Sequence, residues 1–168
     1  MNETLYMFLF LLMFTMILVT AIFAVILIVG IVRGLKSKRT FPMKRLVLFL
    51  VSFSISLILF YNQYFNLDYL PAGELNASFA SLDSRYEIET YHFNGIYGMN
   101  SKAVLVELET GDSKTIYFNW YDYDPMVEWV NKDTVKIGRE TLNIHDGSYD
   151  YRHDPDVIRI LPLQRKIH

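Results

Sequence analysis

Residues 5–32 read LYMFLFLLMFTMILVTAIFAVILIVGIV, a run of 28 residues without one charged side chain. A membrane-spanning helix needs about 20 such residues, whereas the apolar core of a signal peptide has only about 7–15. At about 1.5 Å per residue the run would extend about 42 Å, so we expect it to tilt in a hydrocarbon core of roughly 30 Å. The leading Met1-Asn2-Glu3 lacks the basic residues that begin a signal peptide. No soluble domain of this size could cover such a helix, so the run predicts a transmembrane helix.

A second uncharged run of 20 residues, LVLFLVSFSISLILFYNQYF, occupies residues 46–65 and predicts a second span. Small residues four apart lie on one face of each predicted helix: Thr20 and Ala24 in the first, Ser52 and Ser56 in the second. Because small residues let helix backbones approach closely in lipid, we expect these faces to meet in a helical hairpin. The alternative is that the serines only bond to carbonyls one turn back in their own helix.

The segment between the two runs, residues 33–45, is strongly basic and contains no acidic residue. Its basic residues are Arg33, Lys36, Lys38, Arg39, Lys44 and Arg45. The positive-inside rule places such a loop in the cytoplasm. This predicts a plasma-membrane protein with two spans and with both termini on the extracytoplasmic side. The cluster could also be a site for anionic lipid or nucleic acid, but its role in topology is sufficient to explain it.

The rest of the 168-residue chain has a different composition. Residues 66–168 carry 17 acidic and 10 basic residues, a formal net charge of −7 before histidine. This balance excludes a nucleic-acid-binding protein, because the second half of the chain has no basic surface. The chain has no cysteine. That excludes a disulfide framework, a thiolate nucleophile, a cysteine-ligated metal site and lipidation at cysteine.

Residues 66–154 show the alternation of apolar and polar residues that is typical of β-strands. Leu70-Pro71-Ala72-Gly73 separates this domain from the second helix. We expect strands at residues 85–93, 102–110, 114–121, 126–130, 133–137 and 142–144. In residues 102–110, alternation places Val104, Val106 and Leu108 on one face of the strand. Frequent turn signals without a helical period favour a small antiparallel meander, sandwich or half-open barrel. Residues 155–168 form a tail whose secondary structure the sequence leaves open.

The expected fold class is therefore a two-helix transmembrane hairpin, with spans at residues 5–32 and 46–65, followed by a small antiparallel all-β extracytoplasmic domain. Several motifs in this domain form a distinctive combination. They are Leu70-Pro71-x-Gly73-Glu74, Ser81-x-Asp83-x-x-Tyr86-x-Ile88, Ile116-Tyr117-Phe118-Asn119-Trp120, Val127-Glu128-Trp129-Val130, Asp133-Thr134-Val135-x-Ile137, Leu142-Asn143-Ile144 and Tyr149-Asp150-Tyr151-Arg152.

Over residues 70–152 this combination resembles a family of small membrane-anchored proteins of Gram-positive bacteria, the domain of unknown function 5412. The resemblance implies a membrane-tethered β domain, and it implies no activity, cofactor or catalytic residue. Members have one membrane helix ahead of the domain, so the extra helix here is a departure. A second departure is Ser81-Leu82-Asp83-Ser84, where the family has a Ser-Pro-Asn-Gly-like turn.

The sequence contains no strong catalytic or metal-binding motif. Asp122, Asp124 and Glu128 could offer oxygen ligands to Ca²⁺, but the EF-hand spacing and its glycine are missing, so we interpret them as solvated turn acids. His145 and His153 lie near aspartates without the close spacing of zinc motifs. Residues 66–168 contain neither a nucleophile motif nor a glycine-rich phosphate loop. We therefore predict no enzymatic activity, no cofactor and no metal site.

Residues 66–168 are rich in aromatic side chains, and these are more informative than the weak metal-binding candidates. In residues 117–123, YFNWYDY, strand alternation would place Tyr117, Tyr121 and Tyr123 on one face, opposite Phe118 and Trp120. Exposed tyrosines make good contact residues because each offers a large rigid area and a hydroxyl group. The alternative is that they are cross-strand pairs that stabilise the sheet. We take Tyr117, Tyr121 and Tyr123 as the candidate interaction surface.

Together these patterns predict a membrane-tethered extracytoplasmic interaction module without enzymatic activity. Its expected partners are the lipid bilayer and a membrane or envelope protein, and not nucleic acid. The alternative is an accessory or immunity-type subunit whose hairpin packs on a larger membrane protein, for which Ser52→Leu and Ser56→Leu would abolish function. An envelope hydrolase is the least favoured interpretation.

Overall fold

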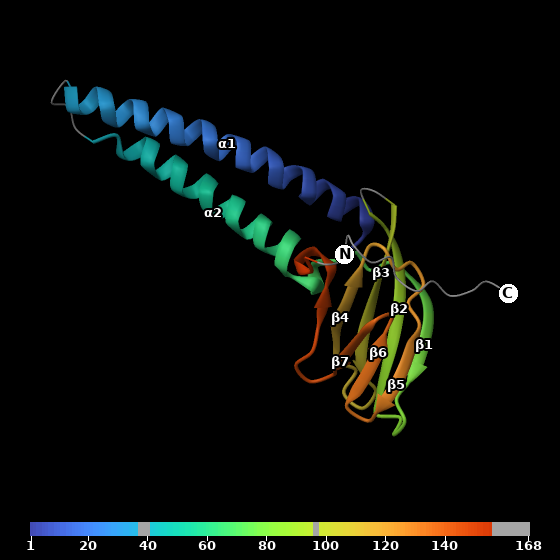
Figure 1. Ribbon diagram of the computed structural model, residues 1–168. Coiled ribbons are helices and arrows are strands. Elements are labelled where there is room, and N and C mark those ends of the chain that lie inside the picture. Colours follow the sequence, from blue (N-terminus) through green and yellow to red (C-terminus); the bar gives the residue numbers. More distant parts are fainter. Residues whose placement is uncertain (37–40, 96–97, 156–168) are drawn as a thin grey trace. The chain divides into compact units, whose positions relative to one another are not determined.

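The computed structural model describes residues 1–36, 41–95 and 98–155, and the chain divides into two compact units (Figure 1). The helical unit is Thr4–Asn66, and the β unit is Met1–Glu3 with Leu67–His168. Two members of the predicted basic loop, Lys38 and Arg39, lie outside the described residues, as do residues 156–168 of the predicted tail.

In the residues that the structure describes, the helical unit has two helices, α1 (Glu3–Lys36) and α2 (Met43–Phe65). By length and composition both are apolar enough to cross a membrane. Each extends beyond its predicted uncharged run, because flanking residues such as Lys36 and Lys44 also favour helix. Pro42 is the N-cap of α2. Its ring is tolerated at the start of a helix but not in its interior, which explains why α2 begins there.

α1 and α2 lie side by side (Figure 1). Their buried residues form a seam that follows a seven-residue repeat. The buried residues of α1 are Tyr6, Met13, Thr20, Leu27 and Gly30. Those of α2 are Ser52, Ser56, Leu59 and Gln63. Such spacing keeps one narrow stripe of each helix facing its neighbour, as in a coiled coil. Outside the stripe the helix surfaces are apolar and exposed, with Leu18 63% and Ile58 62% accessible.

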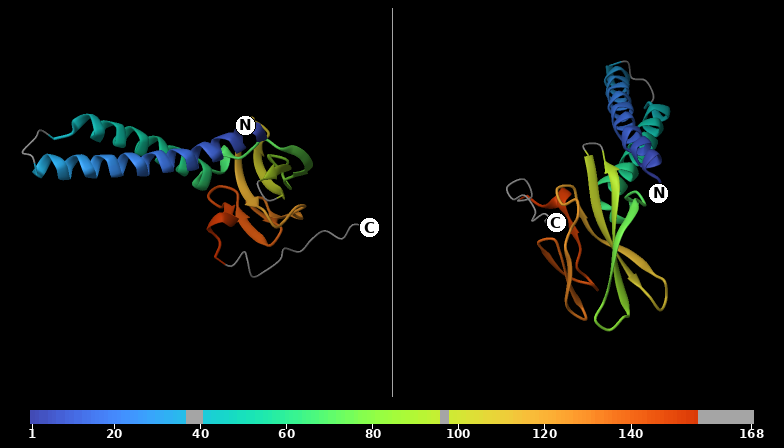
Figure 2. Two further views of the ribbon diagram at one scale, coloured as in Figure 1. Left: turned by 90° about the horizontal axis from the view of Figure 1, so that it is seen from above. Right: turned by 90° about the vertical axis from the view of Figure 1, so that its right-hand side faces the viewer.

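The described residues of the β unit form two sheets, visible as separate layers in Figure 2. The five-stranded sheet has the order β1-β2-β3-β4-β8, and the three-stranded sheet has the order β5-β6-β7. The strands are β1 (Glu74–Ala80), β2 (Tyr86–Gly95), β3 (Gly98–Glu107), β4 (Ser113–Asn119), β5 (Val127–Asn131), β6 (Thr134–Ile137), β7 (Glu140–Asn143) and β8 (Tyr149–Asp150). Short 3₁₀ helices, η1 (Leu67–Tyr69) and η2 (Tyr151–His153), complete the described elements.

One apolar core joins the two sheets. The five-stranded sheet contributes Ile88, Ala103, Leu105, Ile116 and Tyr117, and the three-stranded sheet contributes Val127, Val135, Ile137 and Leu142. Ile88, Ala103, Ile116, Val135 and Ile137 are completely inaccessible to solvent. Burial of such side chains supplies the main driving force for folding, at about 1.5–3 kcal/mol for each large one. The architecture is therefore sandwich-like.

Two strands were not among those that alternation predicts. β1 has mostly exposed or half-buried side chains, so its sequence ELNASFA shows no clear apolar face. It lies at the edge of its sheet, where only one neighbour is needed. β8 has two residues and pairs in parallel with β4. The domain is therefore mostly, and not entirely, antiparallel. The remaining strands fall within a few residues of their predicted positions, although β3 begins at Gly98 and ends at Glu107.

Candidate functional site

The five-stranded sheet has an outer face, which we define as the face turned away from the core. Two cross-strand rows lie on it. One row is Glu89, Val104 and Thr115, and the other begins with Tyr91 and Lys102. Their neighbours along β2 and β3, among them Ile88 and Leu105, point into the core instead. A pocket of about 370 Å³ opens on the outer face above these rows, and Asp68 of η1 and Ser113 of β4 also line it. We call it the Lys102 pocket.

Lys102 is the distinctive side chain of this pocket, because only 7% of the residue is accessible. Its Nζ lies 5.4 Å from the centre of the Tyr91 ring. Within the described part of the chain it has neither a hydrogen-bond acceptor nor an ion-pair partner. Burial lowers the pKa of Lys102, and the carboxylate of Asp68 opposes part of that change. The pocket therefore contains a cation whose donors are available.

The two acidic residues of the pocket are held in place by the sheet. Tyr91 donates a hydrogen bond of 2.5 Å to Oε2 of Glu89. This bond to a carboxylate, together with burial, raises the pKa of Tyr91 to about 12. Asp68 Oδ1 accepts a hydrogen bond of 3.0 Å from the backbone N–H of Thr115 in β4. The pocket thus presents an ammonium group, two fixed carboxylates and the hydroxyls of Ser113 and Thr115.

One feature of the sequence points to this pocket, although the prediction of strands made no use of it. Lys102 shares a strand face with Val104 and Val106, and this face reads as apolar. A lysine on such a face must either reach solvent along its stem or be buried. Here it is buried. The contribution of Asp68 could not be read from strand periodicity, because Asp68 lies in η1 outside every predicted strand.

The prediction that Tyr117 lies on an exposed face is wrong: its accessible fraction is 1%, and it belongs to the core. The reason is a β-bulge in β4. Ala103 pairs with Tyr117 and Val104 pairs with Thr115, so Ile116 is an extra residue. A bulge breaks the strict alternation of a strand. Ile116 and Tyr117 therefore both pack in the core, whereas Phe118, opposite Lys102, is buried on the outer face.

The other two predicted tyrosines lie beyond the end of β4, which stops at Asn119. Tyr123 is 41% exposed and stacks on His92, with ring centres 4.1 Å apart. Tyr121 is half-buried and contacts the rings of Trp120 and Tyr151, at 5.5 and 6.2 Å. The two rings thus belong to different aromatic groups, and not to one strand face.

The interpretation of Asp122 as a solvated turn acid is also wrong, because the residue is fully buried. Its Oδ2 accepts a hydrogen bond from the Tyr117 hydroxyl at 3.2 Å. Its backbone carbonyl accepts one from Ser101, and its Oδ1 has no partner in the described residues. Burial raises the pKa of Asp122. No group of three potential metal-ligating side chains occurs in the part of the chain that the structure describes.

The helix-packing candidates lie on the seam of the helical unit. Thr20 Oγ1 and Ser56 Oγ are 2.9 Å apart and buried. Ser56 Oγ also donates to the carbonyl of Ser52, and Ser52 Oγ donates to that of Phe49. The serines therefore bond to their own helix, as the alternative interpretation expected, while Ser56 also contacts Thr20 across the seam. Ala24, one turn beyond Thr20, is half-buried.

The four basic residues of the predicted cytoplasmic loop that the structure describes, Arg33, Lys36, Lys44 and Arg45, are all exposed.

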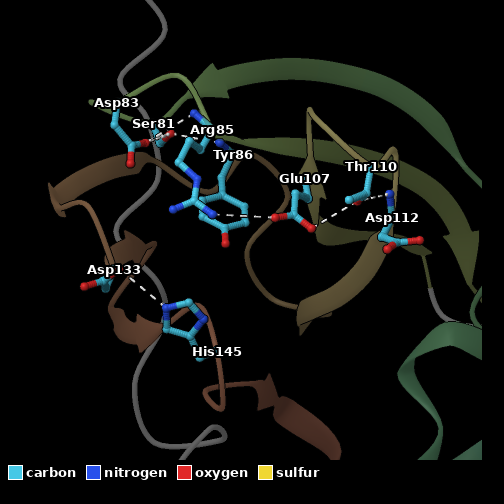
Figure 3. Close-up of polar contacts among 9 residues, drawn as sticks. All are labelled: Ser81, Asp83, Arg85, Tyr86, Glu107, Thr110, Asp112, Asp133 and His145. Carbon is cyan, nitrogen blue, oxygen red and sulfur yellow. Dashed lines mark hydrogen bonds and ion pairs between the residues drawn. The ribbon is translucent and has the colours of Figure 1, made fainter.

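Polar contacts at one end of the β unit stabilise the turns between its strands (Figure 3). Ser81 Oγ donates to Asp83 Oδ1 at 2.8 Å and accepts from the backbone N–H of Tyr86 at 3.0 Å. The bond from Ser81 lowers the pKa of Asp83. Thr110 donates to Glu107 in the next connection, and His145 lies 3.4 Å from Asp133. These contacts hold the turns between strands.

These features define a small protein in which two candidate membrane-spanning helices precede a two-sheet β domain with a polar pocket. The chain belongs to a family of unknown function, DUF5412, whose model matches residues 39–154. The resemblance noted from the motifs is thereby confirmed and extended. The match takes in α2 as well as the β domain, and it leaves the whole of α1 outside.

The chain is also similar to uncharacterized protein YrzH of Bacillus subtilis (strain 168). The two are 45% identical over 40 residues, which cover 23% of this chain and 93% of YrzH. No solved structure matches the chain.

Proposed function

We propose that the protein is a membrane-anchored binding module without enzymatic activity. In this proposal α1 and α2 form a hairpin that crosses the plasma membrane twice. The basic loop between them is cytoplasmic, and the β domain is displayed on the extracytoplasmic side, where it binds a ligand or an envelope partner.

One observation carries the membrane anchor. Each helix uses a narrow stripe to contact its neighbour, and the rest of its surface consists of large exposed apolar side chains. Only 17% of the apolar window of each helix is buried by the protein itself. Helices that are apolar all round require either a protein core or lipid to cover them. The proposal assigns that role to lipid.

The orientation is supported by charge. Residues 33–45 carry six basic and no acidic residues, whereas residues 66–168 have a net charge of −7. Short basic loops remain in the cytoplasm during insertion. The proposal therefore places both ends of the hairpin, and the β domain that follows α2, on the opposite side.

Cysteine labelling tests this proposal directly, because the natural chain has no cysteine. Glu109→Cys introduces a thiol at an exposed position between β3 and β4, and Ser37→Cys introduces one in the basic loop. With a membrane-impermeant thiol reagent on intact cells, we expect only the position 109 variant to react. Labelling of position 37 alone, or recovery of the chain in the soluble fraction, would overturn the proposal.

An accessory subunit remains the second candidate, and one feature of the helical unit favours it. A groove of about 200 Å³ lies on the hairpin between Ile17, Thr20, Phe53 and Phe60. A helix of a larger membrane protein could fill it. The accessory subunit would depend on the surface of the hairpin, whereas the binding module would depend on the β domain. Phe53→Ala and Phe60→Ala should impair the accessory role alone, whereas Tyr121→Ser and Tyr123→Ser should impair a partner contact of the β domain.

A further inference from the structure

We infer that the Lys102 pocket binds a small zwitterion, an amino acid or short peptide with free ends, whose carboxylate pairs with Lys102 and whose ammonium group lies against Asp68 and Glu89. This inference deepens the proposed function, since it names the class of ligand that the β domain takes.

The first step rests on the state of Lys102. A buried ammonium group is costly unless an anion or several acceptors surround it. Lys102 is more than nine-tenths buried, and in the described residues its Nζ faces the Tyr91 ring and is attracted by the Asp68 carboxylate, without a hydrogen bond or an ion pair to either. A ring face satisfies a cation partly and leaves its hydrogen-bond donors unused. A ligand carboxylate would accept those donors in a charge-assisted bond.

The second step rests on the two carboxylates that share the pocket. Glu89 is fixed by Tyr91, and Asp68 is fixed by the backbone of Thr115. Among the side chains that line the pocket, these two are negative and Lys102 is positive, and Met1 also lines it. A doubly charged anion such as phosphate would be repelled by the two carboxylates. A ligand with a single carboxylate and a nearby ammonium group would be complementary to the positive charge of Lys102 and to the negative charges of the two carboxylates.

The third step rests on size and on the remaining polar groups. About 370 Å³ lies within the range of small-molecule sites and suits a ligand no larger than a short peptide. Ser113 and Thr115 add hydroxyls that can serve a backbone amide of the ligand. A neutral sugar would use the hydroxyls, but it would leave the charge of Lys102 uncompensated.

Calorimetric titration of the purified full-length chain in detergent micelles tests the inference. The probe is the dipeptide alanyl-alanine, and its N-acetylated and C-amidated forms each lack one charge. We expect saturable binding of the free dipeptide and a loss of about tenfold or more on removal of either charge. Equal binding of the amidated form, binding of phosphate or a neutral sugar in its place, or no saturable binding would overturn the inference.

Two variants locate the site. Lys102→Met keeps the length of the side chain and removes its charge, so it should abolish binding while the β domain stays folded. Asp68→Asn retains an oxygen for the Thr115 N–H and should remove only the preference for the free ammonium group. Lys114→Met, at an exposed lysine of β4, is the matched control and should bind as the natural chain does. Normal binding by a folded Lys102→Met variant would contradict the assignment.

The titration does not depend on which side of the membrane the β domain occupies. Binding by a chain whose labelling is reversed would therefore overturn the orientation in the proposed function and leave the ligand class in place. Correct labelling without binding would overturn the ligand class alone.

Discussion

Tyr117 donates a hydrogen bond of 3.2 Å to Oδ2 of Asp122, and both residues are buried in the core of the β unit. Asn119 in turn donates to the Tyr117 hydroxyl at 3.1 Å. The core of this small domain thus contains a carboxyl group with one oxygen bonded and, in the described residues, one oxygen unpartnered. A buried carboxyl in this state is stable when protonated and costly when ionised.

The first prediction concerns pH. Because burial raises the folded-state pKa of Asp122 above its unfolded value of 3.8, the folded state binds the proton more tightly. The protonated Asp122 carboxyl therefore stabilises the folded state in full below the pKa that Asp122 has in the unfolded chain. This stabilisation is lost as pH rises through the pKa that Asp122 has in the folded state. We expect Asp122→Asn to be more stable than the natural chain at neutral pH, with a difference that disappears on acidification.

Denaturant unfolding, followed by tryptophan fluorescence over a range of pH, measures this difference. Both tryptophans of the chain, Trp120 and Trp129, lie in the β unit, so the signal reports on this unit. Asp146→Asn changes an exposed acid and serves as the control. A constant difference between Asp122→Asn and the natural chain at all pH values would show that the carboxyl does not titrate with folding.

The second prediction concerns Gly138, which lies against the same pair. A β-carbon at this position would overlap Oδ2 of Asp122 and would lie 3.0 Å from the Tyr117 hydroxyl. Gly138 also has a φ of 59°, a conformation that favours glycine. Gly138→Ala should therefore lower the free energy of unfolding by about 2–4 kcal/mol. Gly111→Ala is the control, because Gly111 has a φ of 76° but open space around its Cα. It should cost only about 1 kcal/mol. Equal losses in the two variants would refute the steric argument.

The third prediction concerns Ser84, which adopts a φ of 56° in the turn between β1 and β2. A side chain costs about 1 kcal/mol in the left-handed region. We expect Ser84→Gly to raise the free energy of unfolding by about 0.5–1 kcal/mol and Ser84→Ala to leave it nearly unchanged. A loss of stability in Ser84→Gly, measured by the same fluorescence assay, would show that the serine hydroxyl stabilises the turn.

Sequence periodicity predicts most of this fold, because it reports which side chains face an apolar layer. The two helices are evident from uncharged runs, and six of the strands from alternation. β1 could not be predicted in this way, since an edge strand needs only one covered face and its residues in ELNASFA are small or polar. β8 owes its strand conformation to two cross-strand pairs with β4, which lies about thirty residues earlier in the chain.

The candidate site was harder to predict than the fold, for two physical reasons. A single extra residue at Ile116 reverses the alternation of β4, so Tyr117 moves from the predicted surface to the core. The Lys102 pocket combines a lysine of β3 with Asp68 of η1, and only the tertiary structure brings these two segments together. Strand alternation does reveal one feature of the pocket, because it places a lysine on the same strand face as two valines.

The last prediction concerns the seam of the helical unit. The Ser56 hydroxyl has one proton, and it donates that proton to the Ser52 carbonyl at 2.9 Å. Thr20 is therefore the donor in the contact with Ser56 across the seam. Thr20→Val keeps the shape and removes only this bond, so it should cost about 0.6 kcal/mol in a membrane environment.

A bulkier change separates packing from hydrogen bonding. Ser56→Leu inserts a large side chain into the buried stripe, whereas Ser54→Leu makes the same change on the exposed face of α2. Thermal unfolding in micelles, followed by far-ultraviolet circular dichroism, should show a clear loss of helix stability for Ser56→Leu and none for Ser54→Leu. If both leucine variants unfold alike, the two faces of α2 are equivalent and the seam does not hold the hairpin together. If Thr20→Val is as damaging as Ser56→Leu, the hydrogen bond, and not the close approach of the backbones, is what the small residues provide.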